Sequence, residues 1–539
     1  MTRQKFKIYI FMKYSIQTMK RKEILNGIVT FLTIISAIIT IFAVSETTKI
    51  IGGIIFLSLC FMYIIYGLVA KYYKNRKIFC DRDDATPSMI KDLKKYKHLA
   101  FIGVSHKKLH EYLEKVIKLN KEKTLPWESI MVFFATHELG KMWEPNDFEN
   151  SIKQSKINLV NILFDENYKK IIPNLNTVQF RQCKSTYKFS SFSGCFLGDE
   201  IFDNNDINLQ VIYSTNHLPT GSQTENSWTI RLKLKTDPLF KEFEKSFNKI
   251  RTEAEIICDV KFSLWEWSAE EWNSFVKNYK YFEEGIDNML NKLDMNNKHI
   301  LDVGSGTGNE AKYLIDKFPQ AKFTLVDASA NMLIKAQDTI GNKAIYELFY
   351  IPSVTANYFT ENNLNKYDYI ISHLSLQSII HNPEEFSCFV SECNRLLKSN
   401  GCVLLAIHNS YNIQLEQDKT QDIFRNDLKN EIEKAKEKCK TEENNLSSLI
   451  NEEKICETFE KKYFEQIYFK KFKLSFTMLD RKRMWEVPAV LDSLVSIEKI
   501  GVSKGKAIVA IASEKNKFYN TPEREMMVFH FQKKSNHQR

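Results

Sequence analysis

One stretch of the chain has the residue types and spacing of a ligand-binding turn: residues 299–311, HILDVGSGTGNEA. It reads as a short apolar strand, a glycine-rich turn and the start of a helix near Asn309. Three glycines stand at alternate positions: Gly304, Gly306 and Gly308. Glycines remove side chains where a ligand must approach the backbone, and the free N–H groups of a helix start point toward that ligand. Alone, the pattern also fits a loose dinucleotide-binding fingerprint.

Two aspartates flank this turn and narrow the choice. Asp302 stands just before the first glycine, at the end of the predicted strand. Asp327 ends a second apolar strand, residues 323–326, and its spacing from the glycines suits a hydrogen bond to a ribose. The segment that follows, ASANMLIKAQ, predicts a capped helix whose Met332 could lie against a flat base.

Together these residues resemble the cofactor half of class I S-adenosylmethionine-dependent methyltransferases, in particular the type 11-like branch. The resemblance implies a Rossmann-like α/β fold with a seven-stranded sheet over residues 264–515, and S-adenosyl-L-methionine as the cofactor. It implies cofactor contacts from these residues: Asp302, Gly304, Ser305, Gly306, Gly308, Asp327, Ala328, Met332 and Ser372. A Rossmann-like domain that uses NAD is the alternative, and Asp302 and the later motifs indicate against it.

The same resemblance places Ser372, His373 and Gln377 at or just past the tip of the fourth strand, facing the transferred methyl. His373 is the candidate general base, which is needed only for a hydroxyl or a protonated amine. A helix-capping or hydrogen-bonded loop histidine is the alternative. An aromatic-rich helical segment, residues 264–290, precedes the first strand, and its Trp272 or Tyr279 could contact the cofactor or simply pack in the core.

Two departures from the family pattern follow the third strand. The loop YIPSVTAN lacks the acidic residue that usually meets adenine, which puts that contact in doubt, and Ser399-Asn400 replace proline-glycine in a turn. No NPPY-type motif and no Pro-Cys follow the fourth strand, which indicates against methylation of DNA bases.

The N-terminal region predicts a membrane anchor. Residues 24–44 and 50–70 are two uncharged apolar runs of 21 residues each, long enough to span a bilayer as helices. With its loop and the basic stretch 71–77, this hairpin covers residues 24–77. Basic clusters lie in residues 1–23 and 71–77, outside the two apolar runs, and predict that both chain ends lie in the cytoplasm. The expected location is therefore the cell membrane, multi-pass. Gly52 and Gly53 would allow close helix contact, so a homo-oligomer is compatible with the pattern.

Between the hairpin and the methyltransferase segment, residues 97–258 predict a separate α/β domain, a ligand sensor or partner-binding module. Strands are expected at residues 99–104, 129–136, 157–164, 208–213 and 228–234, with helices at 106–119 and 237–258. Three histidines suggest chemistry but lack partners at a recognisable spacing, and surface positions explain them: His106, His137 and His217.

After residue 412 the predicted organisation is a charged helical insertion at about 414–462, a closing strand at 506–512, and a basic tail at 516–539. The insertion could be a lid over the substrate or a solvated helical arm. Its mixed charges indicate against nucleic acid as a partner, although the whole chain carries a net charge of +10. The ten cysteines are scattered, without CxxC pairs, and predict no metal site.

These observations predict a membrane-anchored methyltransferase that acts at the cytoplasmic face on a small molecule, a lipid or a protein. The alternative is a non-catalytic membrane effector or signalling protein that senses the cofactor or a nucleotide.

Overall fold

The computed structural model of the 539-residue chain describes residues 61, 76–79, 82–103, 106–120, 123–136, 138, 140–141, 146–183, 192–199, 209–216, 228–233, 237–279, 281–349, 366–408, 430, 451–461, 463–474, 478–492, 501–515 and 524–534. The chain divides into two units. The smaller is Met1–Phe79 with Ile230–Lys241, and the larger is Cys80–Thr229 with Glu242–Arg539. In the smaller unit, β1 (Arg76–Phe79) neighbours β7 (Trp228–Leu232).

The first part of the larger unit forms a mixed sheet whose strands lie in the order β6-β5-β2-β3-β4-β8. Its central strands β2, β3 and β4 are parallel, and each is buried along most of its length. The strands are β2 (His98–Gly103), β3 (Ser129–Phe134), β4 (Thr177–Gln182), β5 (Phe192–Gly198), β6 (Leu209–Asn216) and β8 (Glu255–Lys261). The helices are α4 (Arg82–Leu93), α5 (Leu109–Lys118), α7 (Phe148–Leu163) and α8 (Glu166–Lys169), while α9 (Pro238–Glu253) continues from the smaller unit.

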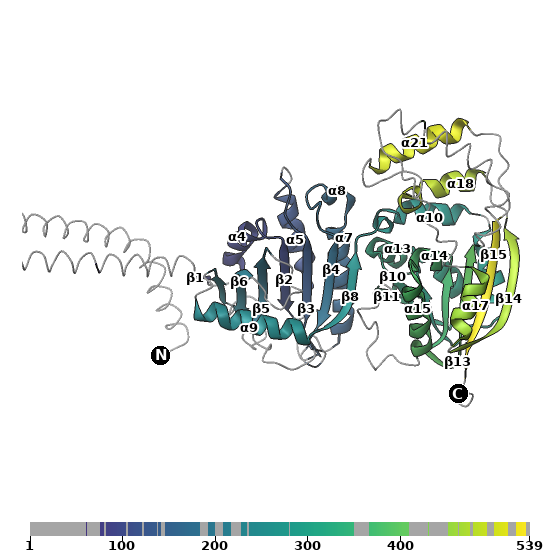
Figure 1. The fold of residues 1–539 in the computed structure, drawn as a ribbon, viewed down its shortest axis with the longest axis horizontal. Helices are drawn as coiled ribbons and strands as arrows, with labels where there is room; N and C mark the ends of the chain where they lie inside the picture. Colours follow the sequence, from purple (N-terminus) through teal and green to yellow (C-terminus); the bar gives the residue numbers. More distant parts are fainter. Residues whose placement is uncertain are drawn as a thin grey trace, which may run out of the picture. The chain divides into compact units, whose positions relative to one another are not determined.

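The second part forms a seven-stranded sheet in the order β11-β10-β9-β12-β13-β15-β14, which confirms the predicted sheet. Figure 1 labels its strands β10, β11, β13, β14 and β15. The first five strands are parallel, and β15 is antiparallel to both of its neighbours. The strands are β9 (His299–Val303), β10 (Lys322–Asp327), β11 (Ala344–Leu348), β12 (Tyr367–His373), β13 (Leu397–His408), β14 (Phe464–Leu474) and β15 (Arg524–Lys533).

Helices surround this sheet, and a helical lead-in precedes it as predicted. The helical elements are η3 (Leu264–Trp267), α10 (Ala269–Asn278), α11 (Phe282–Leu290), α12 (Asn309–Lys317), α13 (Ala330–Ile340), η4 (Gly341–Lys343), α14 (Leu376–Ile379), α15 (Pro383–Leu396), α17 (Glu452–Glu460), α18 (Met478–Trp485), α19 (Pro488–Leu491) and α21 (Val502–Lys515). The chain runs from β9 outward to β10 and β11, then returns to β12 on the other side of β9. Ligands of parallel sheets bind at such a switch point, beyond the carboxyl ends of the strands.

Two predictions for the first sheet are wrong. Residues 157–164 are not a strand but the end of α7, since the buried residues recur with helical spacing at Phe148, Ile152, Leu159 and Leu163. A short apolar run cannot by itself distinguish a strand from a buried helix segment. The helix expected to reach residue 258 ends at Glu253, and β8 follows as an antiparallel partner of β4, so this sheet extends beyond the predicted boundary to Lys261.

Two predictions near the C-terminus are also wrong. The closing strand expected at residues 506–512 is helix α21, which follows Gly501 and is rich in alanine and lysine, both good helix formers. The basic tail expected at 516–539 contains β15, which lies between β13 and β14. Its residues 526–531 are buried, so the methyltransferase segment extends to Lys533 rather than ending at residue 515.

Other predictions fall on residues that the structure does not describe. The two apolar runs at 24–44 and 50–70 lie outside the described residues, apart from position 61, and so does most of the charged insertion at 414–462. Within the ranges given above, none of the helices combines the length and the apolar character needed to cross a bilayer.

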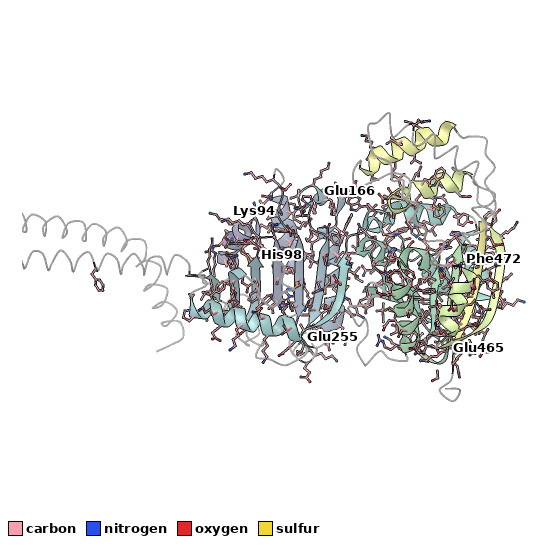
Figure 2. The ribbon with its side chains drawn as sticks, viewed as in Figure 1. Lys94, His98, Glu166, Glu255, Glu465 and Phe472 are labelled. Atoms are coloured by element: carbon pink, nitrogen blue, oxygen red, sulfur yellow. The ribbon has the colours of Figure 1, made fainter. Side chains whose placement is uncertain are left out.

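Two histidines at the first sheet, His98 and His106, have structural partners. His98, labelled in Figure 2, is buried on β2, and its Nδ1 lies 2.8 Å from Ser129 Oγ. Nε2 of His106 lies 3.1 Å from the backbone oxygen of Phe133. The positions of His137 and His217 fall outside the described residues.

Candidate active site

The glycine-rich turn joins β9 to α12, and its backbone adopts conformations that glycine tolerates. The φ angles of the three glycines are +72° at Gly304, +52° at Gly306 and +74° at Gly308. A Cβ atom on Gly304 would lie 2.4 Å from Cβ of Ser375, and one on Gly308 would collide with α13. These two glycines therefore allow protein segments to pack closely. Only Gly306 faces an aromatic ring, since its Cβ would lie 3.2 Å from Trp272 Nε1.

The end of β10 holds the turn in place. The N–H group of Ser305 donates to the backbone oxygen of Val326 at 3.1 Å, and that of Gly306 donates to Asp327 Oδ2 at 2.8 Å. Asp327 Oδ1 accepts from the N–H group of Ser329 at 2.8 Å. Burial raises the pKa of Asp327 to about 6, although these hydrogen bonds oppose the shift. Each carboxylate oxygen has two lone pairs, so Asp327 keeps acceptor capacity for a ligand.

Helix α13 begins directly after this aspartate, and a buried acid from η3 caps it. Glu266 accepts from the N–H group of Ala330 at 3.0 Å. Burial raises the pKa of Glu266 to about 7. Of the two cofactor contacts predicted in this region, Ala328 is half-buried, and Met332 is only 2% exposed and lies in the core.

A buried acidic cluster lies at the carboxyl ends of β9 and β12. Asp302 and Glu310 are both buried, and burial followed by the charges of Glu310 and Asp327 holds the pKa of Asp302 well above its usual range. His373 Nδ1 lies 3.2 Å from Glu310 Oε2, without the directionality of a hydrogen bond. Three further buried atoms of this cluster and its turn have no hydrogen-bond partner among the described residues: Asp302 Oδ2, Ser305 Oγ and Glu310 Oε1.

Two residues predicted to face the methyl group serve other contacts. Ser372 is fully buried, and its Oγ lies 2.7 Å from Ser375 Oγ, which donates to the backbone oxygen of Val303 at 2.7 Å. Gln377 Nε2 donates to the backbone oxygen of His408 at 2.7 Å. Through Ser375, Ser372 is linked to the end of β9, and Gln377 links α14 to the end of β13.

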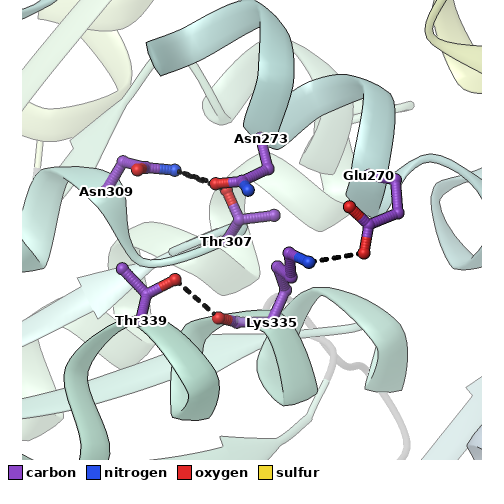
Figure 3. Close-up of polar contacts among 6 residues, drawn as sticks. All are labelled: Glu270, Asn273, Thr307, Asn309, Lys335 and Thr339. Atoms are coloured by element: carbon purple, nitrogen blue, oxygen red, sulfur yellow. Dashed lines mark hydrogen bonds and ion pairs between the residues drawn. The ribbon is translucent and has the colours of Figure 1, made fainter.

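Helix α10 is fastened above the glycine turn by polar contacts (Figure 3). Asn309 Nδ2 donates to Asn273 Oδ1 at 2.9 Å and to Thr307 Oγ1 at 2.8 Å. An ion pair joins Glu270 of α10 to Lys335 of α13. These contacts fix the backbone that carries Trp272, and so they position its ring against the turn.

Beside the turn, the same lead-in helices line a cavity of about 130 Å³. Most of its wall is aromatic or apolar: Trp265, Trp272, Phe275, Tyr279, Tyr281, Phe282, Leu374, Leu474, Met484, Val490 and Met526. His373 also lines it, with its ring centroid 5.2 Å from that of Phe282. Tyr279, predicted as a cofactor contact or a core residue, lines this cavity and is buried.

Sequence reasoning missed Glu310 and Glu266. Glu310 stands two residues after the last glycine, and an acid in the first turn of the helix is its local signal, while its burial is seen only in the structure. Glu266 lies among the tryptophans of the lead-in segment and is far in sequence from the helix that it caps, so no local pattern indicates its role.

The parallel sheet, its switch point and the glycine turn define a Rossmann-like cofactor-binding domain. Residues 300–401 match a family whose model is described as a methyltransferase domain. A malonyl-[acyl-carrier protein] O-methyltransferase of Acetivibrio thermocellus is 34% identical over 109 residues, which are 19% of this chain and 36% of that protein. The chain thus spans about a third of the length of this curated relative. The family match confirms the predicted S-adenosylmethionine-dependent class for this domain.

Similar solved structures include a phosphoethanolamine N-methyltransferase 2 of Haemonchus contortus in complex with S-adenosyl-L-methionine. It is 14% identical, covers 84% of this chain and 98% of that chain, and has a TM-score of 0.32. The cyclopropane synthase MmaA2 of Mycobacterium tuberculosis is 16% identical, covers 47% of this chain and 84% of that chain, and has a TM-score of 0.30. TM-scores of this size are too low to assign a shared fold over the whole chain.

Proposed function

We propose that this chain is an S-adenosylmethionine-dependent methyltransferase whose cofactor binds along the glycine turn, between Asp302 and Asp327. The supporting observation is the set of buried polar atoms without partners beside that turn, which includes Asp302 Oδ2 and Ser305 Oγ. Buried polar groups normally have partners, and a ligand that supplies hydrogen-bond donors would satisfy these. S-Adenosylmethionine carries an ammonium group, a sulfonium and ribose hydroxyls, which suit a site formed by carboxylates.

In this proposal Asp302 accepts from the ammonium group and Asp327 accepts from the ribose hydroxyls. Bound there, the cofactor supplies a methyl group on positively charged sulfur, so the electrophile needs no further activation. The protein's task is to align the acceptor at about 3 to 3.5 Å and to exclude water. Trp272, which lies against Gly306, serves the exclusion of water. His373, at the end of β12, holds the proton that the acceptor loses.

We further propose that the chain is anchored in the cell membrane through residues 24–44 and 50–70, with both ends in the cytoplasm. The uncharged length of each run and the basic flanking clusters support this proposal. Reporter fusions at Lys77 and after Arg539 should both give a cytoplasmic signal. A signal from the opposite side at either fusion would refute the topology.

Calorimetry on the full-length protein in detergent micelles tests the cofactor site. Asp327→Ala removes a charge-assisted acceptor, worth about 1.5 to 3 kcal/mol, and should weaken S-adenosylmethionine binding about ten- to hundredfold. Asp327→Asn retains one acceptor oxygen and should lose less. The matched control is Asp338→Ala, which removes an exposed carboxylate from α13 and should leave the affinity unchanged. Equal affinities in all four proteins would place the ligand elsewhere.

Turnover distinguishes a methyltransferase from a cofactor sensor. Release of S-adenosylhomocysteine in the presence of a cell metabolite extract is expected of the wild-type protein. Gly306→Val places a branched side chain against Trp272 and in the ligand's path, so it should abolish both binding and release. Tight binding without release in any extract would favour the sensing function instead.

A further inference from the structure

The cavity beside the glycine turn has a wall without formal charge. No lysine, arginine, aspartate or glutamate lines it within the described part of the chain. Five aromatic rings follow one another along the wall, and centroids of successive neighbours in the run from Trp265 through Trp272, Phe275 and Tyr279 to Tyr281 lie 5.5 to 6.1 Å apart. Aromatic faces carry partial negative charge and attract cations in a desolvated site. Since lysine and arginine are missing from the described wall, a carboxylate or phosphate group would find no permanent positive charge there, only the imidazoles of His373 and His408.

The groups behind this wall are acidic. Glu310 Oε2 lies 3.2 Å from Nδ1 of His373, on the side of the ring away from Gly285. A positive charge that enters the cavity is stabilised by the Glu310 carboxylate, whereas an anion is repelled. The electrostatics therefore favour an acceptor that is cationic before or after methyl transfer.

His373 is placed to remove a proton from such an acceptor. Its Nε2 has no hydrogen-bond partner among the described residues, and it faces Gly285 of α11, where a Cβ would lie only 3.2 Å away. Its Nδ1 faces Glu310 Oε2. Hydrogen bonds between catalytic groups are often long before the substrate binds and tighten in the complex. With the proton of the neutral ring on Nδ1, toward the carboxylate, Nε2 is free to act as the base.

We infer that the cavity binds a small primary or secondary amine, that His373 deprotonates it for N-methylation, and that Glu310 positions His373. This inference rests on the proposed function. The ammonium form of the amine passes one proton to His373 Nε2. The freed lone pair then forms the N–CH₃ bond, the S–CH₃ bond pair stays on sulfur as a neutral thioether, and the positive charge passes to the methylated nitrogen. The proton on His373 leaves to solvent.

A hydroxyl acceptor fits these observations less well. Its proton loss develops negative charge on oxygen near Glu310, in a cavity whose described wall holds neither lysine nor arginine. An amine keeps the site neutral or positive throughout, which the aromatic faces favour.

Matched pairs of amines and alcohols test the acceptor class. Full-length protein in detergent micelles, saturated with S-adenosylhomocysteine, is titrated with butylamine and butan-1-ol, benzylamine and benzyl alcohol, and 2-phenylethylamine and 2-phenylethanol. Tryptophan fluorescence reports binding, since Trp265 and Trp272 line the cavity. At least one amine should bind tenfold or more tightly than its alcohol, and with S-adenosylmethionine it should yield the N-methyl product.

Equal binding of an alcohol, an O-methylated product, or no binding of any amine would overturn the inference. Binding of S-adenosylhomocysteine is measured separately by calorimetry. If it binds and the amines do not, the acceptor inference fails while the cofactor proposal stands. If it does not bind, the proposed function itself fails.

Three variants test the roles of the two side chains. With a methylated amine as substrate, His373→Ala should lower kcat about 10²- to 10⁴-fold with little change in the dissociation constant of that amine. Added imidazole should restore part of the lost kcat, which a purely structural histidine would not show. Glu310→Gln should lower kcat tenfold or more at saturating cofactor, and Glu310→Asp should recover part of it. Asp316→Asn, an exposed change on the same helix, should have no effect.

Loss of amine binding in His373→Ala without loss of kcat at saturation, or failure of imidazole to raise turnover, would refute the role of His373 as the base. A Glu310→Gln variant with normal kcat would refute the positioning role.

Discussion

Replacement of Glu266 by glutamine should change the pH dependence of stability. Glu266 is 1% exposed in η3, and its carboxyl oxygens accept from Ala330 and Asn331 of α13 and from the Ser329 hydroxyl. Burial raises its pKa from the usual 4.5 to about 7 in the folded protein. At roughly 1.4 kcal/mol per pH unit, this difference corresponds to about 3 kcal/mol of folding free energy.

The direction in which stability changes with pH depends on which form of Glu266, protonated or ionised, the folded protein disfavours. Because the ionised carboxylate is destabilised by burial, the contribution of Glu266 is fully present below pH 4.5 and is lost as the pH rises through about 7. Glutamine does not ionise, so it lacks this loss. At pH 5 the variant should be less stable than the wild type by about 1 to 3 kcal/mol, because its amide nitrogen faces a backbone donor. By pH 8 the difference should shrink or reverse, a change of about 3 kcal/mol.

The assay is denaturant unfolding of full-length protein in detergent, followed by tryptophan fluorescence, at pH 5, 6, 7 and 8. The difference between variant and wild type is used because the contributions of other titrating groups, such as Asp302, then cancel. Glu283→Gln, at an exposed position on α11, is the control and should give a constant difference. The reasoning would be refuted if the difference in unfolding free energy between Glu266→Gln and the wild type did not change with pH. It would also be refuted if the wild type became more stable relative to the variant as the pH rises.

The remaining predictions concern packing around the site and the closing strand. Gly285→Ala places a methyl group 3.2 Å from His373 Nε2. It should lower kcat more than it lowers the affinity for the cofactor, which is measured by calorimetry. An unchanged kcat would mean that the acceptor does not reach His373 from the side of Gly285. Phe531→Ala removes a fully buried ring from β15 and should lower the free energy of unfolding by about 3 to 5 kcal/mol, measured with denaturant. Ile467→Ala, at an exposed position of β14, is the control and should lower it much less. Equal losses in the two variants would contradict the inner position of β15.

Local sequence signals predicted the centre of the methyltransferase segment well. The strand, glycine turn and helix at residues 299–317 form as expected because their apolar pattern and the three glycines act over a few residues. The structure adds a second reason for glycine at Gly304 and Gly308, since a Cβ there would collide with other segments, while their contact with a cofactor stays a prediction. That second reason depends on distant segments, which a local pattern does not contain.

The two errors near the C-terminus have different causes. Residues 524–533 follow a charged segment and precede the chain end, and these features suggest a tail. The same residues pair with β13 on one side and β14 on the other, and this non-local pairing buries them. In residues 502–515 the helix propensity of the surface positions outweighed the apolar pattern that suggested a strand.

The sequence by itself determined the class of the second domain, because the glycine turn and the two aspartates lie within about 30 residues of one another and their spacing is set by local geometry. It also identified His373 as a residue at a strand end. Only the tertiary structure decided what surrounds His373. The fold brings Glu310 from α12 and the aromatic rings of the lead-in helices to the same strand end, although up to about 100 residues separate them along the chain. Burial then shifts the pKa values of Asp302, Asp327 and Glu266, because the cost of a charge depends on the three-dimensional surroundings and not on the neighbouring letters.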